Sequence, residues 1–569
     1  MSIDPTAMDG QEKEGGTSTN EQAEAKPEGL DRRTFLKSSA AAGAALKSLF
    51  SAPGAATLAA GASLLGAEEA KAQKTPDYDY FGLMPEGGTT PFRLPMGALG
   101  YLDRNEYIQN MKIISYTPGV SISVAEPLIN MWAKGARRLL PIGDGFLDVS
   151  NPAKPEIVNQ HAWIRGQTNV VYNTKLKKWI LMTSASMPLS GATPEYPHGR
   201  WDPGAREKAM SYKGLRGIRT YDVTNPEKPS LLQEYNTGST GHGTHMNFYD
   251  GGQYAYLDCG WTDQLRMEQA QRVFSTALMI VDMSDPSNVQ EVSKWWAPGQ
   301  MLDEDEQYKQ WTFANDHSSW SCAHGAPVVP QRIEDGGRYG YGGFAAFGMY
   351  VFDFSDIRHP KAVGRAFWPF EPMSDIPYHT VYPIITDDAH PKLRNLAFST
   401  VECLFADGRE PYHTPHVIDL SDPHNPQIIG LFPRPKPPED APYTDFIFAR
   451  GRFGSHNPQA WVAPGQMRPE LAIIAWFNAG VRVFDLSEPT APREVAWYVP
   501  PRTGEMSNYE SWWRGTTENV FVEWDRNLIW IGVHGGTYCL SCPALGEPVL
   551  EARKIERWSV PHVNAGWDE

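Results

Sequence analysis

The stretch "VIDLSDPHNPQIIG", residues 417–430, places two apolar segments on either side of a turn rich in Asp, Asn and Pro. Its apolar residues are mainly β-branched, which favours strands. Asp and Ser side chains accept hydrogen bonds from turn N–H groups, and Pro fits a turn position whose N–H is not needed. The stretch therefore predicts a β-hairpin.

The same phrase recurs along the chain, each time with an Asp between apolar residues and a Ser or Thr two positions later. Six clear copies carry Asp148, Asp222, Asp282, Asp353, Asp419 and Asp485. A seventh copy, residues 537–550, has Cys539 at this position. Each interval has room for two more strands, and such four-stranded units cannot bury their faces alone. The sequence therefore predicts an all-β fold, a seven-bladed β-propeller over residues 97–569.

The phrase resembles the repeat of the LVIVD family of predicted propeller proteins. The resemblance covers nearly all of the chain after its N-terminal region. It implies the propeller fold and says little about function.

The N-terminal region resembles a twin-arginine (Tat) export signal. "DRRTFLKSSAAAGAALKSLF", residues 31–50, has two arginines before an Ala-rich run, and "AKA" at residues 70–72 fits a cleavage site. The resemblance implies a signal region at residues 1–72, an extension at 73–96, and export by the Tat translocase to the periplasm or the medium. A membrane anchor is the alternative. Because no later run of about 18 apolar residues occurs, we expect no stable membrane span in the mature chain.

Charge and cysteine content narrow the function classes. The formal net charge is −16, and the sequence pI is about 5.5, which argues against nucleic acid as a partner. The five cysteines can form at most two disulfides. Cys539 and Cys542 could be a local disulfide, a redox pair or half of a zinc site, and the sequence does not decide between these.

Histidines recur where the innermost strands are expected to begin. "THMNFYD", "AHGAPVVP", "YHTVYPII" and "SHNPQAWV" align His245, His324, His379 and His456 in four successive blades. These starts share one mouth of the central channel with the ends of the second strands. Two such ends read acid-Cys in the same register, with Asp258 and Glu402 as the acids.

Imidazoles that converge from several blades predict a first-row transition metal site. We expect the four histidines as ligands and Asp258 and Glu402 as second-shell carboxylates that orient them. Glu518 and His534 are candidates for proton transfer. His242 is a further candidate proton carrier, a fifth ligand or a plain loop residue. The alternative is that the histidines form a polar plug without metal.

The constellation looks like that of two groups of propeller enzymes, without sharing their sequence motifs. Carotenoid and stilbene cleavage oxygenases hold iron with four histidines, and selenium-binding or methanethiol oxidase proteins have histidines around copper. The resemblance implies oxidase or oxygenase chemistry with dioxygen at iron or copper. We prefer iron, with copper as the alternative, because Tat export permits loading of the metal in the cytoplasm. The spacing of the four histidines around the ring differs from that in these enzymes, because four successive blades span only about half a ring. Either one histidine is not a ligand, or the metal lies off the axis.

Long loops between strands that meet at this mouth carry aromatic residues: Trp201, Trp261, Trp311, Tyr443, Phe446, Trp512 and Trp513. Such loops favour a small apolar or aromatic substrate. They could instead pack on each other or against another subunit of an oligomer. We therefore expect an exported metal-dependent oxidoreductase. The alternatives are a metal-dependent lyase or hydrolase, and a non-catalytic propeller that binds a ligand or a protein.

Overall fold

The computed structural model describes ten segments of the 569-residue chain: residues 103–122, 131–160, 168–187, 210–266, 275–311, 322–367, 376–403, 412–449, 451–502 and 516–563. The expected signal region, residues 1–72, and the extension, residues 73–96, lie outside the described residues. The predictions about export are therefore not addressed by the structure.

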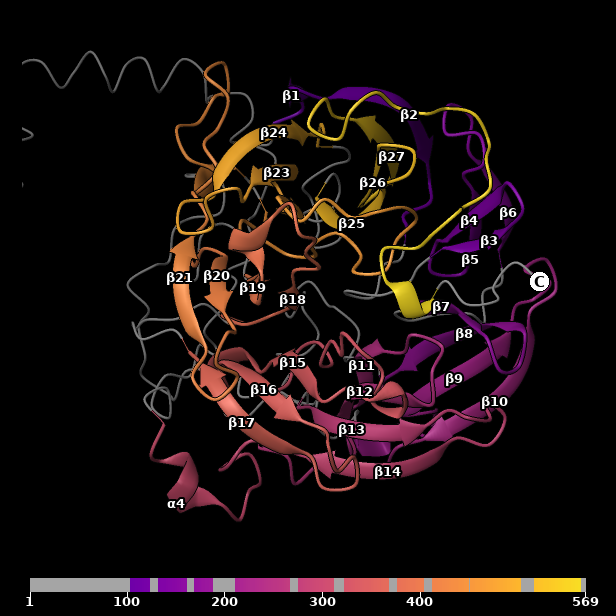
Figure 1. Ribbon diagram of the computed structural model, residues 1–569, viewed down its shortest axis with the longest axis vertical. Coiled ribbons are helices and arrows are strands. Elements are labelled where there is room, and N and C mark those ends of the chain that lie inside the picture. The colour runs from indigo at the N-terminus through magenta and orange to yellow at the C-terminus, as the bar shows by residue number, and fades with distance from the viewer. Residues whose placement is uncertain are drawn as a thin grey trace, which may run out of the picture. The chain divides into compact units, whose positions relative to one another are not determined.

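Seven antiparallel sheets stand around a common axis (Figure 1). The predicted seven-bladed β-propeller is confirmed. We number the blades in the order of the seven phrases and give their strands from the axis outwards. Blade 1 contains β3 (Trp132–Lys134), β4 (Arg137–Pro141), β5 (Gly145–Asp148) and β6 (Glu156–Gln160). Blade 2 contains β7 (Thr168–Asn173), β8 (Lys178–Ala185), β9 (Gly217–Asp222) and β10 (Ser230–Asn236). Blade 3 contains β11 (Gly243–Phe248), β12 (Tyr254–Gly260), β13 (Ala277–Asp282) and β14 (Gln290–Trp295).

The remaining blades follow in chain order. Blade 4 contains β15 (Tyr339–Gly343), β16 (Met349–Asp353) and β17 (Lys361–Ala366). Blade 5 contains β18 (Val381–Pro383), β19 (Leu396–Ser399), β20 (His416–Asp419) and β21 (Gln427–Leu431). Blade 6 contains β22 (Leu471–Ala475), β23 (Val481–Asp485), β24 (Arg493–Val499) and β1 (Tyr107–Gln109). Blade 7 contains β25 (Thr517–Glu523), β26 (Leu528–Val533), β27 (Gly536–Ser541) and β2 (Lys112–Pro118).

Helices among the described residues are short. They are α4 (Asp305–Tyr308) and the 3₁₀ turns η3 (Ile333–Asp335), η4 (Ala345–Phe347), η5 (Pro391–Leu393), η6 (Phe446–Phe448) and η7 (Pro561–Val563). No helix of the described segments is long and apolar enough to cross a membrane.

The repeated Asp ends a strand in all six clear copies and closes the following turn. In each copy its Oδ1 accepts the backbone N–H of the Ser or Thr two positions later, at 2.8–2.9 Å. This bond explains why the phrase keeps an Asp and a hydroxyl residue at this spacing. The hairpin prediction is therefore confirmed at the level of a single hydrogen bond.

Two expectations about the blades were wrong. Among the described residues, blades 4 and 6 lack an innermost strand, and that position holds only an isolated bridge, Val328 to Tyr341 in blade 4 and Pro458 to Ile474 in blade 6. In blade 7 the seventh phrase does not supply its own outer strand, because β27 pairs with β2 from the start of the described chain. β1 likewise adds to the outer edge of blade 6. The N-terminal strands thus close the ring and cover two sheet edges that would otherwise be exposed.

Buried charges join the closing blade to blade 1. Glu523, at the end of β25, accepts hydrogen bonds from Trp530 at 2.8 Å and from the Nη2 of Arg526 at 2.6 Å. Arg138 of β4 reaches the same carboxylate from blade 1 and also donates to Asp525 at 2.6 Å. Burial opposes ionisation of Glu523, but the two arginines outweigh it and lower the pKa of this carboxyl. The cluster therefore holds a buried anion between two cations.

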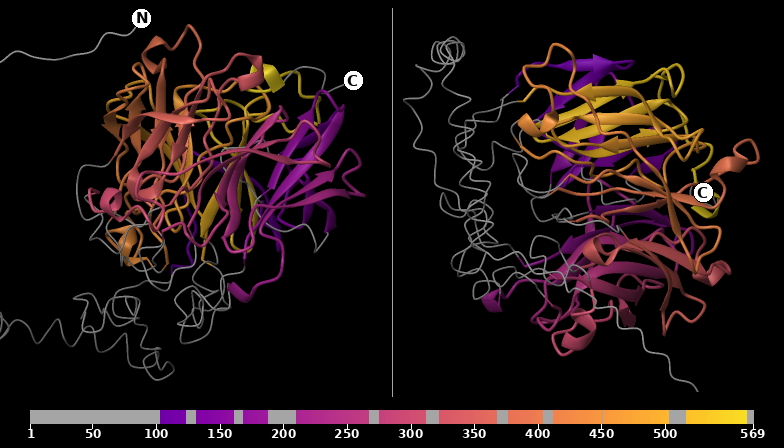
Figure 2. Two further views of the ribbon diagram at one scale, coloured as in Figure 1. Left: turned by 90° about the horizontal axis from the view of Figure 1, so that it is seen from below. Right: turned by 90° about the vertical axis from the view of Figure 1, so that its left-hand side faces the viewer.

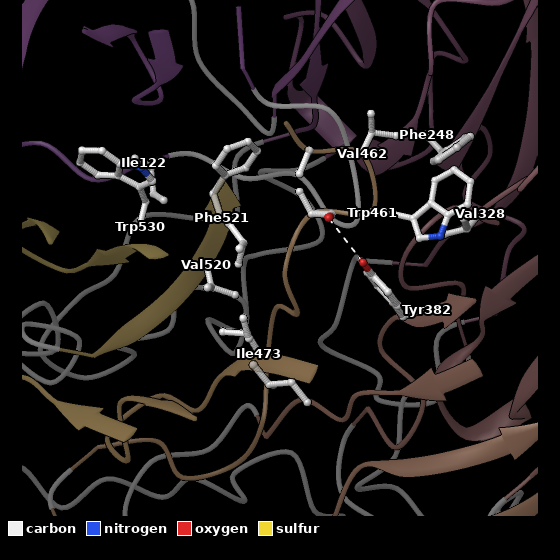
Figure 3. Close-up of a cluster of buried hydrophobic side chains, with 14 of the residues drawn as sticks. Ile122, Phe248, Val328, Tyr382, Trp461, Val462, Ile473, Val520, Phe521 and Trp530 are labelled. Carbon is white, nitrogen blue, oxygen red and sulfur yellow. Dashed lines mark hydrogen bonds between the residues drawn. The ribbon is translucent and has the colours of Figure 1, made fainter. Parts of the chain in front are cut away.

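Large apolar side chains fill the centre of the propeller (Figure 3). The rings of Phe248 from blade 3 and Trp461, near the inner edge of blade 6, lie 6.4 Å apart. Trp461 donates to the carbonyl of Pro383 at 2.9 Å, and the Tyr382 hydroxyl lies 3.4 Å from the Ala460 carbonyl. Side chains of blades 3, 5 and 6 therefore contact one another across the ring.

The last described residues cover the ends of the inner strands. Trp558 bridges to Pro464, and Ser559 bonds the backbone of blade 6 next to it. His562 of η7 lies 2.8 Å from Asp250, which follows β11 of blade 3. Figure 2 shows η7 as the short yellow helix at one face of the propeller. The C-terminal segment thus links two blades that lie far apart around the ring.

Candidate metal centre

Four imidazole rings, one from each of blades 3 to 6, lie in a row where the inner edges of these blades begin. The ring centroids of His245 and His324 are 5.2 Å apart, and those of His324 and His379 are 4.2 Å apart. The ring of His456 follows at 4.8 Å from that of His379. The structure thus brings together the four histidines that the sequence aligned. We call this end of the channel the histidine mouth.

Backbone pairing fixes three of these histidines in the same way. Each donates its N–H to a carbonyl at the end of the neighbouring strand, at 2.8–3.0 Å: His324 to Gly343, His379 to Thr400 and His456 to Ala475. His245 lies inside β11. The repeat therefore presents the rings at equivalent heights because the strands pair in equivalent registers.

The carboxylate of Glu402 lies among the imidazoles. Its Oε2 is 3.2 Å from the Nε2 of His379 and 3.5 Å from the Nε2 of His324. Its Oε1 is 3.6 Å from the Nε2 of His456. Ligand atoms of His324, His379 and Glu402 all lie within 4.8 Å of one another. We expected Glu402 to orient the histidine ligands without contacting the metal. Its carboxylate instead lies where a metal ligand would lie. The ring of His245 contacts the ring of His324.

Hydrogen bonds on the far side of two rings orient their Nε2 atoms. The Nδ1 of His456 lies 2.9 Å from the carbonyl oxygen of Glu518. A carbonyl can only accept, so Nδ1 carries a hydrogen, and in the neutral ring Nε2 keeps its lone pair. The Nδ1 of His379 lies 3.0 Å from the Thr380 hydroxyl. Both Nε2 atoms therefore face Glu402.

Arg452 was not anticipated from the sequence. Its Nη2 donates to the Oε1 of Glu402, and its Nε donates to the Cys403 carbonyl at 2.5 Å. Burial opposes ionisation of Glu402, but Arg452 and the histidines outweigh it and hold the pKa of this carboxyl well below its usual range. Arg452 stands four residues before His456 in "GRFGSHN", a spacing that matches no motif, so the sequence carried no signal for it.

Two buried histidines are held neutral. Burial and the neighbouring His379 lower the pKa of His324 well below its usual value, although Glu402 acts in the opposite direction. Burial, His245 and Arg216 do the same to the pKa of His242, which lies just before β11. A neutral imidazole offers a lone pair, which a metal requires. For His242, a pKa this low disfavours the role of a proton carrier near neutral pH.

Asp258 lies in a different register from Glu402, contrary to expectation. Asp258 stands four positions after Tyr254, which pairs with the anchoring Asp282. Glu402 stands six positions after Leu396, which pairs with Asp419. Asp258 is thus still within the paired part of its strand, where its Oδ2 is 3.4 Å from the Met246 N–H. Burial raises the pKa of Asp258 to about 7.

Glu518 and His534 form an ion pair at the edge of the cluster. The Nε2 of His534 is 3.2 Å from the Oε1 of Glu518, and the His534 side chain is 44% exposed. Burial raises the pKa of Glu518, but His534 outweighs it and the pKa is lowered. Burial lowers the pKa of His534, but Glu518 outweighs it and the pKa is raised. The pair links the backbone that anchors His456 with solvent.

The LVIVD repeat family matches residues 273–295, which contain the third phrase and the strands β13 and β14. The seven sheets of the structure agree with this match. The chain is a seven-bladed β-propeller that carries an LVIVD repeat.

Two solved propeller structures are similar to this chain. The β-propeller domain of Myceliophteria thermophila Cps50 (Swd1) is 9% identical, with 76% of this chain and 99% of that chain covered and a TM-score of 0.39. The RRP9 WD40 repeats are 8% identical, with 77% and 100% covered and a TM-score of 0.39. No curated protein matches the chain.

Other histidines of the LVIVD-repeat propeller lie away from the mouth. His359 pairs with Asp356 at 2.8 Å on an exposed turn, and His424 lies in the corresponding turn of blade 5. His390 contacts Asp387 at 2.7 Å on the β18–β19 connection. His359 and His424 thus lie in turns of the repeated phrase, and His390 lies outside it. His198 lies outside the described residues.

The loop aromatics divide into three sets. Tyr443 and Phe446 are buried and contact each other at 5.7 Å, so they pack into the propeller and do not line a surface. Trp261 and Trp311 are partly exposed and pack against other aromatic rings. The loop residues Trp201, Trp512 and Trp513 lie outside the described residues.

In the seventh phrase, Cys539 and Cys542 are buried free thiols.

Proposed function

We propose that this propeller is a metal-dependent oxidase or oxygenase whose transition metal binds to His324, His379 and Glu402. The observation that carries the proposal is that two imidazole Nε2 atoms face one carboxylate oxygen, at 3.2 and 3.5 Å. Two histidines and one carboxylate are the ligand set of many non-haem iron(II) oxygenases. We therefore propose iron as the metal, with copper as the alternative.

The surrounding residues fit such an ion. Arg452 occupies Oε1 of Glu402 and leaves Oε2 toward the imidazoles. His456 and His245 flank the three ligands and are candidates for a fourth. A bound metal would supply a position for dioxygen or substrate and polarise what binds there. We propose that a small molecule reaches the ion through the histidine mouth.

Proton transfer is assigned to the pair of Glu518 and His534. The pair stands next to His456, and His534 is the member that reaches solvent. We keep the proposal of a small apolar or aromatic substrate, which the sequence suggested from the loop aromatics. Of these, Tyr443 and Phe446 do not contribute, because they pack into the propeller. Lewis-acid chemistry by the same ion, as in a lyase or hydrolase, is the related alternative.

One observation favours a second function, a non-catalytic propeller that binds a ligand or a protein. Arg452 already neutralises Glu402, and the carboxylate is within hydrogen-bonding distance of His379. The cluster can therefore exist as a polar network without an ion. In that case the histidines stabilise the channel mouth and carry no chemistry.

Metal analysis and oxygen uptake separate the two functions. We expect purified protein to contain about one iron or copper per chain and to consume dioxygen with some members of a panel of small aromatic compounds. Treatment with a strong chelator should remove both the metal and the oxygen uptake, and re-addition of the metal should restore them. Protein without stoichiometric metal, after growth and reconstitution with either ion, would leave the binding propeller as the function.

We further propose that the protein acts outside the cytoplasm, as the twin-arginine resemblance of its N-terminal region implies. Replacement of both Arg32 and Arg33 by Lys should retain the protein in the cytoplasm, because the Tat translocase requires this pair. Cell fractionation measures the outcome. Normal export of the double variant would contradict the assignment.

A further inference from the structure

Blades 4 and 6 share one type of turn, which joins β15 to β16 in blade 4 and β22 to β23 in blade 6. The Phe344 N–H donates to the Gly348 carbonyl at 2.8 Å, and the Trp476 N–H donates to the Gly480 carbonyl at 2.7 Å. In each turn the second residue has a left-handed backbone. It is Ala345 in blade 4, with φ of 43°, and Phe477 in blade 6, with φ of 42°. The chain thus offers an internal comparison at one structural position.

A phenylalanine is an unfavourable choice at this position. Positive φ is uncommon for residues other than Gly, Asn and Asp, and it is a true outlier for a bulky side chain. Backbone strain of this kind is kept only where many surrounding contacts enforce the conformation, and it is found most often at functional sites. Blade 4 meets the same backbone requirement with the small Ala345. The backbone of the turn therefore does not explain why residue 477 is a phenylalanine.

The contacts of the Phe477 ring explain the presence of phenylalanine at this position. The Cζ of Arg452 is 3.8 Å from the centroid of the Phe477 ring, and the His456 ring centroid is 4.7 Å from it. The ring is fully buried. In the same turn, the Asn478 N–H donates to the Arg452 carbonyl at 3.1 Å. Phe477 thus touches both groups that hold the Oε1 side of Glu402.

We propose that Phe477 is a positioning residue, whose ring fixes Arg452 and His456 so that Glu402 presents Oε2 to His324 and His379. This inference rests on the proposed metal site. A guanidinium that lies flat on an aromatic face is attracted to it and loses freedom to rotate. With the ring in place, Arg452 keeps Oε1 occupied, and the carboxylate cannot turn. Partners of this kind typically change metal affinity by about 10–100-fold when they are removed.

Three variants of Phe477 and one control test the inference. Phe477→Leu keeps much of the volume and removes the aromatic face. Phe477→Ala reproduces the residue of blade 4, and Phe477→Tyr restores the face. Phe484→Ala is the matched control, because Phe484 is a buried ring of the same blade that packs on Trp476 and Phe432. The control creates a comparable cavity away from Glu402.

Co²⁺ titration followed by visible absorption is the first measurement, because the bands report both affinity and ligand geometry. We expect Phe477→Leu and Phe477→Ala to bind Co²⁺ about tenfold or more weakly, with shifted bands. Phe477→Tyr should stay close to the wild type. Phe484→Ala should lower the melting temperature and leave the Co²⁺ affinity and bands unchanged. Wild-type affinity and bands in Phe477→Leu would overturn the inference.

Crystal structures of the metal-free wild type and Phe477→Leu form the second measurement, which does not depend on metal binding. We expect Arg452 to leave Glu402 in the variant and to stay on it in the wild type. An unchanged Arg452 in the variant would overturn the positioning role. A wild type that binds no Co²⁺ would instead contradict the proposed function, and the two failures are therefore distinguishable.

Discussion

Replacement of Glu402 by Gln should remove most of the metal from the protein. The amide keeps the shape of the carboxylate but loses the charge that faces His324 and His379, and it leaves the buried Arg452 without its anion. His324→Ala and His379→Ala should have the same effect, because each removes one of three ligand atoms. The metal-to-protein ratio, measured by elemental analysis after identical purification, should fall by about tenfold or more.

His359→Ala and His424→Ala are the matched controls. Both residues lie in turns of the repeated phrase, and neither substitution should change the metal content. His245→Ala and His456→Ala then distinguish three ligands from four. If the ligands are His324, His379 and Glu402, these two variants should lose only part of the bound metal. If all four histidines are ligands, they should lose as much metal as His379→Ala. Retention of full metal by Glu402→Gln would exclude the carboxylate as a ligand.

Glu523→Gln should destabilise the protein more than any surface change. The substitution leaves the fully buried Arg526 without its carboxylate and leaves the fully buried Arg138 with Asp525 alone. Removal of one partner from a buried charge cluster typically costs about 3–5 kcal/mol. The measurement is the free energy of unfolding from urea titration, with the slope compared between variants to test for a change in cooperativity.

Glu227→Gln is the control for this prediction. Glu227 pairs with Arg137, the neighbour of Arg138 in β4, and both side chains are substantially exposed. Exposed pairs contribute about 1 kcal/mol or less. Equal losses of stability in the two variants would show that the buried cluster adds no net stability over a surface pair.

The fold was predictable because its signal is local and repeated. The Asp and hydroxyl residue of each phrase bond within three residues of chain, so the hairpin is encoded in the stretch that forms it. Blade 7 was the exception. Its outer strand, β2, comes from the opposite end of the chain, and no local pattern in the seventh phrase reveals that pairing.

The candidate site was predictable only where it follows the repeat. The four histidines begin the inner edges of successive blades, so alignment of the phrases was enough to bring them together. The position of Glu402 depends on how far the chain runs beyond β19 before it turns, which the acid-Cys pattern did not reveal. Arg452 and Phe477 act through contacts with neighbouring segments, and such contacts have no fixed spacing in sequence.

The closure of blade 7 also sets the order in which the molecule can be completed. The Tyr116 hydroxyl of β2 donates to the Gly535 carbonyl, 419 residues later in the chain. During synthesis β2 leaves the ribosome long before β27 does. The six earlier hairpins can form as they emerge, but the sheet of blade 7 must wait for β27. Such distant pairing is slow, and the waiting strands expose unpaired edges. A newly made chain is therefore an open arc before it is a ring, and its aggregation hazard is concentrated in that interval.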